Sequence, residues 1–261
     1  MEEHNNLIVK EFKKQAKDFS NQTLSMNNQD YIKWMIRSLQ LNKQMKVLDV
    51  AAGTGILSRA IAPYVDRVVS VDISEAMIEE GITQNDLQGI NNIEYIHGHV
   101  EQLPFEEDTF DLVISRFAFH HFLNPLLVLT EMTRVCKSQA DVAVIDMISD
   151  EDETLSEQYN YYERLRDPSH TLALTKTQFM DYFNQAGLEI QTEDVLQVPV
   201  NVNSWLTLTK TEDKIAQHIK TSLQQELISS NEMTGMFPFV QGDELMFKQT
   251  WLQIIGKKRA M

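Results

Sequence analysis

Cysteine is almost absent from this sequence. Its 261 residues contain one, Cys136, which excludes an internal disulfide and any zinc site built from several cysteines. Long apolar runs are also missing, and none approaches the ~20 residues that a membrane-spanning helix needs. The first residues are polar, Glu2 to Asn6, unlike a signal peptide. From these absences we expect a cytoplasmic protein without an integral membrane segment.

Basic residues are scarce as well. The chain has 23 Lys and Arg against 38 Asp and Glu, a formal net charge of −15. Such a surface repels phosphate backbones, so nucleic acid is not an expected partner. The one basic cluster, residues 257–259, is interpreted as a solvated tail. Hydrophobic residues make up 43% of the chain, enough for a sizeable core and against intrinsic disorder.

Apolar strand patterns alternate with helical ones over most of the first 148 residues. Two amphipathic helices are expected first, at residues 7–19 and 30–41. Strands are then expected at residues 46–50, 67–71, 93–96, 110–115 and 142–146, with helical patterns between them. This alternation is typical of βαβ units and a parallel sheet.

Regular patterns return near the C-terminus. Thr175 and Gln178 form a capping-box pattern for a helix that stops at Gly187. Further strands are expected near residues 188–195 and 250–255. The fold class predicted is therefore α/β: a Rossmann-like, doubly wound, mostly parallel seven-stranded sheet with helices on both faces.

The domain organisation follows from where the alternation of strand and helix patterns is interrupted. Residues 1–44 are expected to form N-terminal helices that act as a lid. Residues 45–261 are expected to form one domain, interrupted by helical insertions at about 149–174 and 201–245.

The first strong strand runs directly into a glycine-containing turn at residues 47–55. Small side chains there let a ligand lie against the backbone, and the next helix offers free N–H groups. Asp72, seventeen residues beyond Gly55, ends the next strand, where a carboxylate can accept both hydroxyls of a ribose. A glycine-rich turn can also serve packing alone, but the terminal acid in register favours a nucleoside site.

The ligand is predicted to lack phosphates. The dinucleotide fingerprint requires a third Gly or Ala where this chain has Ser58. Asp49 beside the turn is also a poor neighbour for pyrophosphate. A cationic sulfonium with an ammonium group suits these carboxylates better, which favours S-adenosylmethionine over NAD.

Several further segments carry a family resemblance. They are residues 47–55, 71–74 with Met77, 98–105, 110–113, 115–122, and Arg164 with Asp167 and His170. The chain resembles the class I S-adenosylmethionine-dependent methyltransferases, and among them the methyltransferase type 11 branch similar to ubiquinone/menaquinone-biosynthesis C-methyltransferases. The resemblance is close over residues 45–147 and extends weakly to residue 190. It implies in-line methyl transfer to a small-molecule acceptor, with S-adenosylhomocysteine as product and no metal.

The resemblance also implies a cofactor site. The implied residues are Asp49, Ala51, Gly53 and Gly55 at the methionine part, Asp72 at the ribose, Ile73, Met77 and Val100 at the adenine, and Ser115 with Arg116 at the end of the fourth strand. His99 stands where the family usually has an aspartate for the adenine amino group, so adenine affinity and its pH dependence are expected to differ. Residues 137–141 replace a Pro-Gly-Gly turn, and an altered loop is expected there.

Histidines are the catalytic candidates. His120 and His121 follow the fourth strand at the carboxyl edge of the sheet, where open α/β sheets bind ligands. Either could act as general base if the acceptor is an oxygen or an acidic carbon; the alternative is a structural histidine. The candidates for substrate contact are Arg164, Arg166, Asp167 and His170, which could instead form a salt-bridged loop. His97 and His99 lack an evident third metal ligand.

Two other functions remain open from the sequence: an NAD(P)-dependent oxidoreductase, and a module that binds S-adenosylmethionine without turnover and acts through a partner. Calorimetry with each nucleotide separates the first from a methyltransferase, and a methyl-transfer assay separates the second. The aromatic candidates for the lid are Phe12, Phe19 and Trp34.

Overall fold

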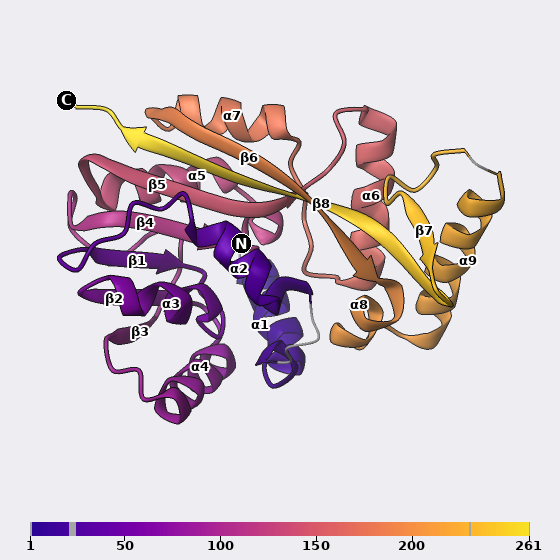
Figure 1. Ribbon diagram of the computed structural model, residues 1–261, viewed down its shortest axis with the longest axis horizontal. Helices are drawn as coiled ribbons and strands as arrows, with labels where there is room; N and C mark the ends of the chain where they lie inside the picture. The colour runs from indigo at the N-terminus through magenta and orange to yellow at the C-terminus, as the bar shows by residue number, and fades with distance from the viewer. Residues whose placement is uncertain (1, 21–24, 230, 261) are drawn as a thin grey trace.

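The computed structural model describes residues 2–20, 25–229 and 231–260, so parts of the expected segments 1–44 and 201–245 lie outside the described residues. A sheet runs through the molecule with helices on both sides (Figure 1). The strands are β1 Lys46–Val50, β2 Arg67–Asp72, β3 Ile93–His97, β4 Phe110–Arg116, β5 Cys136–Ile148, β6 Leu188–Asn201, β7 Pro238–Gln241 and β8 Glu244–Lys258. The helices are α1 Glu2–Gln15, α2 Gln29–Ile36, α3 Ile56–Ile61, α4 Glu75–Gln88, α5 Pro125–Val135, α6 Glu153–Arg166, α7 Lys176–Gln185, α8 Val202–Leu208 and α9 Asp213–Ser229.

The order of the strands confirms the predicted fold class. Seven strands of the described chain follow the order β3-β2-β1-β4-β5-β8-β6. Strands β1 to β5 pair in parallel, whereas β8 is antiparallel to both β5 and β6. The order reverses between β1 and β4, so the carboxyl ends of these strands flank the crevice where doubly wound sheets bind ligands.

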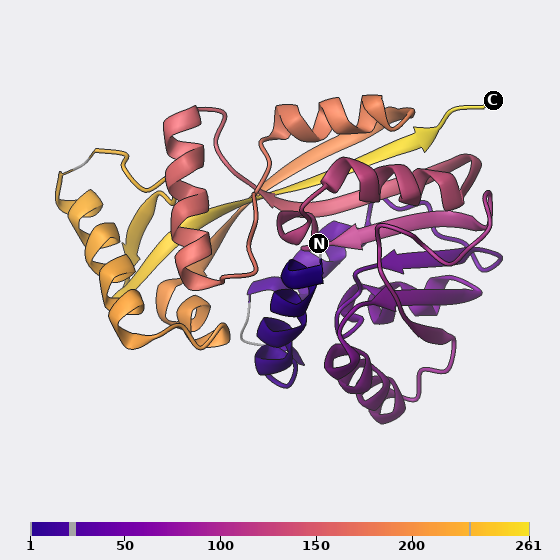
Figure 2. The ribbon, with the colours of Figure 1, turned by 180° about the vertical axis from the view of Figure 1, so that it is seen from behind.

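Both faces of the central strands are covered. Val47 and Leu112 pack in the cluster that includes residues of α2 and α3, and Leu48 and Val113 pack in the cluster that includes residues of α5 and α7. Successive side chains of a strand point to opposite faces, so an apolar run is buried on both sides. The view from behind brings α5 in front of the strands (Figure 2).

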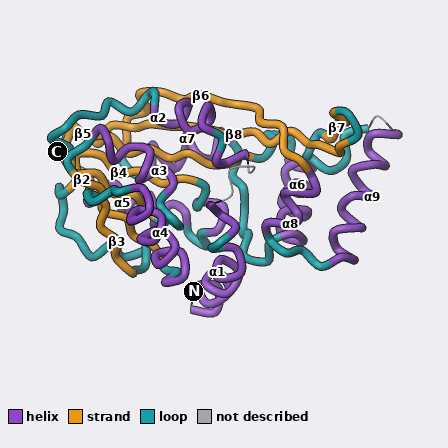
Figure 3. Tube along the Cα trace, turned by 60° about the horizontal axis from the view of Figure 1, so that its bottom comes forward, coloured by secondary structure: helices purple, strands orange, loops and turns teal. Residues whose placement is uncertain are grey.

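Strands β6 and β8 extend well beyond the parallel strands. The sequence predicted strands only near 188–195 and 250–255, but β6 reaches Asn201 and β8 begins at Glu244. Their outer halves stay paired and carry α6, α8, α9 and β7 at one end of the molecule (Figures 1 and 3). Pro199 fits in β6 because this strand lies at the sheet edge.

The expectation that residues 201–245 are mostly helical holds for α8 and α9 and is wrong beyond them. β7 and the start of β8 form a hairpin in which Gln241 pairs with Glu244. Gly242 in its two-residue turn has a φ of 62°, the left-handed conformation that such hairpins need. The Gly-Asp pair at 242–243 is a recognisable signal for this hairpin.

Smaller differences affect the helices and one loop. The first helix begins at Glu2 and ends at Gln15, earlier than the predicted 7–19, and the segment 149–174 contains α6. The segment 137–141, expected to form an altered loop, interrupts the pairing of β5 with β4 and contains Gln139 with a φ of 61°. The capping box of Thr175 with the residue three positions on is present as predicted.

Candidate functional site

The turn after β1 forms the floor of a pocket. Ala51, Gly53 and Gly55 have φ values of 55°, 57° and 75°, which bend the chain sharply into α3. Ala51 to Thr54 line the pocket, which holds about 1510 Å³ of empty space when its open mouth is counted. Gly55 does not line it; a Cβ there would come within 2.1 Å of the Tyr95 hydroxyl, so this glycine is needed for packing.

Asp72 is fixed beside this turn. One carboxylate oxygen accepts the Gly53 N–H at 2.7 Å, and the other accepts the Ser74 N–H at 2.8 Å. Burial raises the pKa of Asp72, and these two hydrogen bonds oppose that rise. Each carboxylate oxygen can accept a further hydrogen bond, and Asp72 lines the pocket.

Apolar side chains continue the lining from Asp72. Ile73, Met77 and Val100, the residues that the resemblance implies for the adenine, all border the pocket. Met77 is held by the start of α4, whose N-cap Ser74 accepts the Met77 N–H at 3.4 Å.

Three other predicted cofactor residues do not line the pocket. Asp49 is buried behind the turn, where Ser58 donates a hydrogen bond to one of its carboxylate oxygens. Ser115 is buried and its hydroxyl donates to the Val50 carbonyl at 2.9 Å, tying β4 to β1. His99 is exposed, and its Nδ1 lies 3.2 Å from the side-chain nitrogen of Asn5 in α1.

Asp49 carries an unusual charge environment. Burial raises its pKa to about 6, against the effects of the Ser58 hydrogen bond and the positive charge of Arg116. Among the described residues, its Oδ1 has no hydrogen-bond partner, and neither has the buried Thr54 hydroxyl at the pocket wall.

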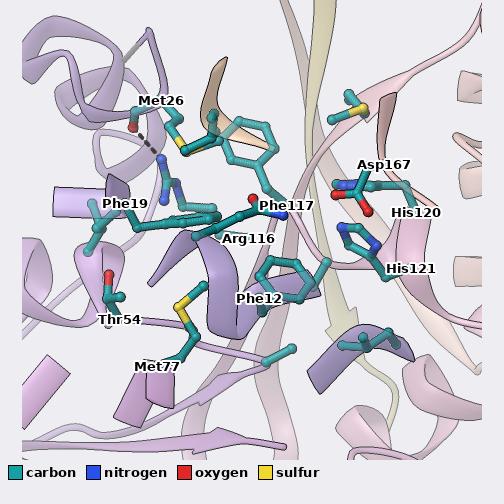
Figure 4. A pocket seen from close by; sticks show the side chains of 18 of the residues that line it. Phe12, Phe19, Met26, Thr54, Met77, Arg116, Phe117, His120, His121 and Asp167 are labelled. Carbon is teal, nitrogen blue, oxygen red and sulfur yellow. Dashed lines mark hydrogen bonds between the residues drawn. The ribbon is translucent and has the colours of Figure 1, made fainter. Parts of the chain in front are cut away.

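Arg116 projects from the end of β4 into the pocket (Figure 4). Its guanidinium donates to the Met26 carbonyl and to Met35 Sδ and lies over the Phe117 ring. No carboxylate of the described residues forms an ion pair with it within 4.0 Å. Burial lowers its pKa to about 10, so it stays charged at neutral pH.

His120 and His121 lie together at the other end of the pocket (Figure 4). Their ring centroids are 4.2 Å apart, and both side chains are buried. His120 Nδ1 lies 2.6 Å from Asp146 Oδ1, and His121 Nδ1 lies 3.0 Å from the Ser169 carbonyl. The structure therefore brings both predicted catalytic histidines to the pocket.

The four predicted substrate residues divide into two pairs. Arg166 and Asp167 line the pocket. Arg164 is exposed and donates to the Thr171 carbonyl at 3.0 Å, and His170 is buried against Asn160 at 2.7 Å, outside the lining. Arg164 and His170 thus tie α6 to the loop that follows it, through hydrogen bonds and not through the salt bridges weighed as the alternative.

The proposed aromatic lid is present in part. Phe12 and Phe19 border the pocket, with ring centroids 5.9 Å apart. Trp34 does not; it is buried in the core and donates to Asp194.

Sequence reasoning missed the far wall of the pocket. It consists of residues brought by the long strands and by α8: Met147, Val200, Ser204, Trp205, Leu208, Gln249 and Trp251. Two buried donors in the lining, Gln15 Nε2 and Trp205 Nε1, have no protein acceptor among the described residues. No motif marks these residues; only their tryptophans, which are rare in the chain, could have drawn attention.

Comparisons with known proteins agree with this geometry. A family model described as a methyltransferase domain matches residues 48–144. The methyltransferase YcgJ of Bacillus subtilis is 30% identical over 195 residues, which cover 75% of this chain and 77% of YcgJ. The chain belongs to this methyltransferase family.

Other relatives extend the likeness. The crystal structure of YcgJ from Bacillus subtilis matches with a TM-score of 0.80 and 26% identity, covering 89% of this methyltransferase and 99% of that chain. A demethylmenaquinone methyltransferase of Clavibacter sepedonicus is 29% identical over 175 residues, 66% of this chain and 70% of the relative. The protein is thus an S-adenosylmethionine-dependent methyltransferase of the type 11 branch, EC 2.1.1.-.

The residues of the methyltransferase fit S-adenosylmethionine. The unpartnered oxygens of Asp49 and Thr54 lie where the chain turns under the pocket, and Asp72 and Glu101 add carboxylates to its lining. Acceptors and negative charges complement a ligand with an ammonium and a sulfonium group.

The described residues contain neither a metal-binding cluster nor a membrane-spanning helix. Among residues 2–20, 25–229 and 231–260, no group of three His, Cys, Asp or Glu side chains is arranged to hold a metal ion. In the same part of the chain, no helix has the length and apolar character needed to cross a bilayer.

Proposed function

We propose that this methyltransferase moves the methyl group of S-adenosylmethionine to a small-molecule acceptor by in-line displacement. The observation that carries the proposal is the continuity of one pocket, which joins the Asp72 side to an aromatic compartment that ends at His120 and His121. S-adenosylmethionine supplies a methyl group on a positively charged sulfur. Alignment of an acceptor in such a compartment can contribute roughly 7–11 kcal/mol to lowering the barrier.

The cofactor is proposed to lie along the turn. Asp72 would accept the ribose hydroxyls, and Ile73, Met77 and Val100 would pack around the adenine. Asp49 and Gly55 would act from behind the lining. The Asp49 carboxylate would attract the positively charged ligand, and Gly55 would allow the turn its shape. His99 is proposed to reach the adenine edge by turning its exposed ring away from Asn5, which it contacts in the structure.

The acceptor is proposed to be a small, largely apolar molecule. The compartment is walled by Phe12 of α1, Phe117 after β4, Trp205 of α8 and Trp251 of β8. One relative is named for its action on demethylmenaquinone, also a small molecule. The net charge of −15 argues against a nucleic acid in this role.

Calorimetry followed by a turnover assay tests the proposal. S-adenosylmethionine and S-adenosylhomocysteine should bind and NAD should not. Release of S-adenosylhomocysteine is then measured with a panel of phenols, quinols and amines. Binding of NAD in place of S-adenosylmethionine, or binding without turnover on any acceptor, would contradict the proposed reaction.

A further inference from the structure

A cluster of buried polar residues surrounds the two histidines of the pocket. The groups around them come from β5, from α6 and its following loop, from α1, and from β4. They are Asp146, Glu163, Arg166, Asp167, His170 and His4, together with Arg116, whose charge acts on Asp146. Burying charged and polar groups costs free energy unless they are hydrogen-bonded or paired, and hydrogen bonds hold this cluster together.

His120 is held in one orientation by Asp146. Because a carboxylate only accepts, the imidazole Nδ1–H must donate to Asp146 Oδ1 across the 2.6 Å contact. Asp146 is itself fixed by the N–H groups of Ala118, Phe119 and Met147, at 3.0, 2.7 and 2.7 Å. The ring nitrogen left over, Nε2, has no hydrogen-bond partner among the described residues, and His120 lines the pocket.

His121 is held in the same tautomer by other partners. Its Nδ1–H donates to the Ser169 carbonyl at 3.0 Å, and the Ser169 hydroxyl in turn donates to Asp167 at 2.5 Å. Nε2 of His121 is also without a partner in the part of the chain that the structure describes. Phe12 packs edge-on against this ring, with centroids 5.0 Å apart.

The surroundings separate the two imidazoles electrostatically. Burial disfavours a charged His120, but the Asp146 carboxylate outweighs it and the pKa of His120 is raised. Burial and the neighbouring charge of His120 lower the pKa of His121 to about 4. Paired groups with divergent pKa values are typical of an assigned acid and base.

Building on the proposed methyl transfer, we infer that His120 and Asp146 form a general-base dyad, and that His121 is a neutral hydrogen-bond acceptor that orients the substrate. Two imidazole nitrogens that can accept a hydrogen bond at one compartment suit an acceptor molecule with an O–H group that can be ionised. The apolar rings around it fit a flat hydroxyarene or enol. The unpartnered Trp205 Nε1–H is a donor available to a second oxygen of such a molecule.

In the proposed step the acceptor loses a proton to the dyad and gains the methyl group from sulfur. The O–H proton passes to His120 Nε2, and the electron pair of that bond stays with the acceptor. An electron pair of the acceptor forms the new bond to the methyl carbon, and the pair of the broken sulfur–methyl bond remains on sulfur. Afterwards the proton leaves His120 for solvent, and Asp146 keeps its charge throughout.

The test uses 4-nitrophenol, whose ionised form absorbs in the visible, with the full chain saturated with S-adenosylhomocysteine. At a pH about one unit below the pKa of the dye in water, roughly a tenth of the free dye is ionised. We expect most of the bound dye to be ionised. His120→Gln should reduce the ionised-to-neutral ratio of bound dye at least fivefold, and Asp146→Asn should reduce it in the same direction. His218→Gln, on the exposed side of α9, is the matched control and should leave the ratio unchanged.

Dye that binds only in its neutral form, fails to bind, or ionises equally in His120→Gln would overturn the dyad. Histidine side-chain NMR is the second readout: the pKa of His120 should fall in Asp146→Asn, and an equal pKa in both proteins would also overturn it. Prior calorimetry with S-adenosylhomocysteine keeps the two proposals apart. If the wild type does not bind S-adenosylhomocysteine, the methyl-transfer proposal itself is contradicted. If it binds S-adenosylhomocysteine but does not ionise the dye, only the dyad is contradicted.

Discussion

Asp49 has one carboxylate oxygen held by Ser58 and the other unpartnered, in a place where burial raises its pKa to about 6 from 3.8. A folded-state pKa above the unfolded value means that the carboxyl's contribution to stability is complete below pH 4. It is lost as the pH rises through about 6. The site therefore keeps a negative charge at neutral pH at the expense of stability.

Replacing this charge should make stability less dependent on pH. Relative to the wild type, Asp49→Asn should gain about 2–3 kcal/mol of unfolding free energy between pH 4 and pH 7.5, because only the wild type loses stability as this carboxyl ionises. Urea unfolding at the two pH values measures it, with exposed Asp66→Asn as control. If the unfolding free energies of the variant and the wild type differ by the same amount at both pH values, the raised pKa of Asp49 is contradicted. The same variant should bind S-adenosylmethionine more weakly.

Asp72 should contribute directly to binding. Asp72→Asn keeps an acceptor for the Gly53 N–H but loses the charge that strengthens bonds to ribose hydroxyls. A hydrogen bond to a charged group is worth about 1.5–3 kcal/mol, so calorimetry should show S-adenosylmethionine binding roughly 10- to 150-fold weaker. Asp86→Asn, exposed on α4, is the comparison. Unchanged affinity in Asp72→Asn would remove the ribose role.

Single residues were predictable from sequence where position alone decides their place. Asp72 ends a strand next to a glycine turn, and strand ends in a parallel sheet share one edge, so it had to lie at the crevice. Ser115 and His99 are next to such positions, but the alternation of a strand directs Ser115 to Val50, and the α1 residue Asn5 meets His99. Side-chain direction and long-range contacts are not contained in a local motif.

At the scale of elements, β8 depends on a glycine for its packing against α7. A Cβ on Gly256 would lie 2.7 Å from Phe183 Cδ1 and 2.9 Å from Leu188 Cβ. Gly256→Ala should lower the unfolding free energy by about 1–3 kcal/mol, the usual cost of overpacking. Chemical denaturation checks it against Gly98→Ala, where the nearest atom is Val71 Cγ1 at 3.5 Å. Equal stability of the two variants would contradict the close packing.

The helix α1 is expected to act on the acceptor more than on the cofactor. Phe12 contacts His121 and Phe19 by its ring, and aromatic pairs are worth about 0.5–1.5 kcal/mol. Phe12→Ala should therefore weaken 4-nitrophenol binding roughly 2- to 10-fold and change S-adenosylhomocysteine affinity less. Exposed Lys10→Ala on the same helix is the control. Equal loss for both ligands would show that α1 serves the cofactor instead.

The parallel strands were predictable because each contains an apolar stretch near a turn signal, although β5 begins at Cys136 and not at residue 142 as predicted. The outer halves of β6 and β8 were not, because their pairing with each other is a long-range contact far from the parallel core. Gly242 and Asp243 are a local signal for the hairpin, but the helical pattern that precedes them extends the predicted helical segment as far as residue 245.

For the molecule as a whole, ligand binding should stabilise core and insertions together. The reason is that α1, the turns after the parallel strands, and α8 with the outer parts of β6 and β8 all line one pocket. S-adenosylhomocysteine at about 100 times its dissociation constant should add about 2.7 kcal/mol of stability and raise the melting temperature by roughly 5–10 °C. Circular dichroism and tryptophan fluorescence should report one coincident transition. A separate early transition in the fluorescence of Trp205 and Trp251 would contradict this coupling.

The antiparallel pair β6 and β8 has a consequence for how acceptor choice can change. One end of this pair is fixed in the methyltransferase core, and the other supplies Val200, Gln249 and Trp251 to the pocket. Residues at the outer end can therefore be substituted without changing the end that pairs within the core. Exchanging residues at the outer end between relatives should therefore graft a new acceptor preference onto an unaltered methyl-donor site.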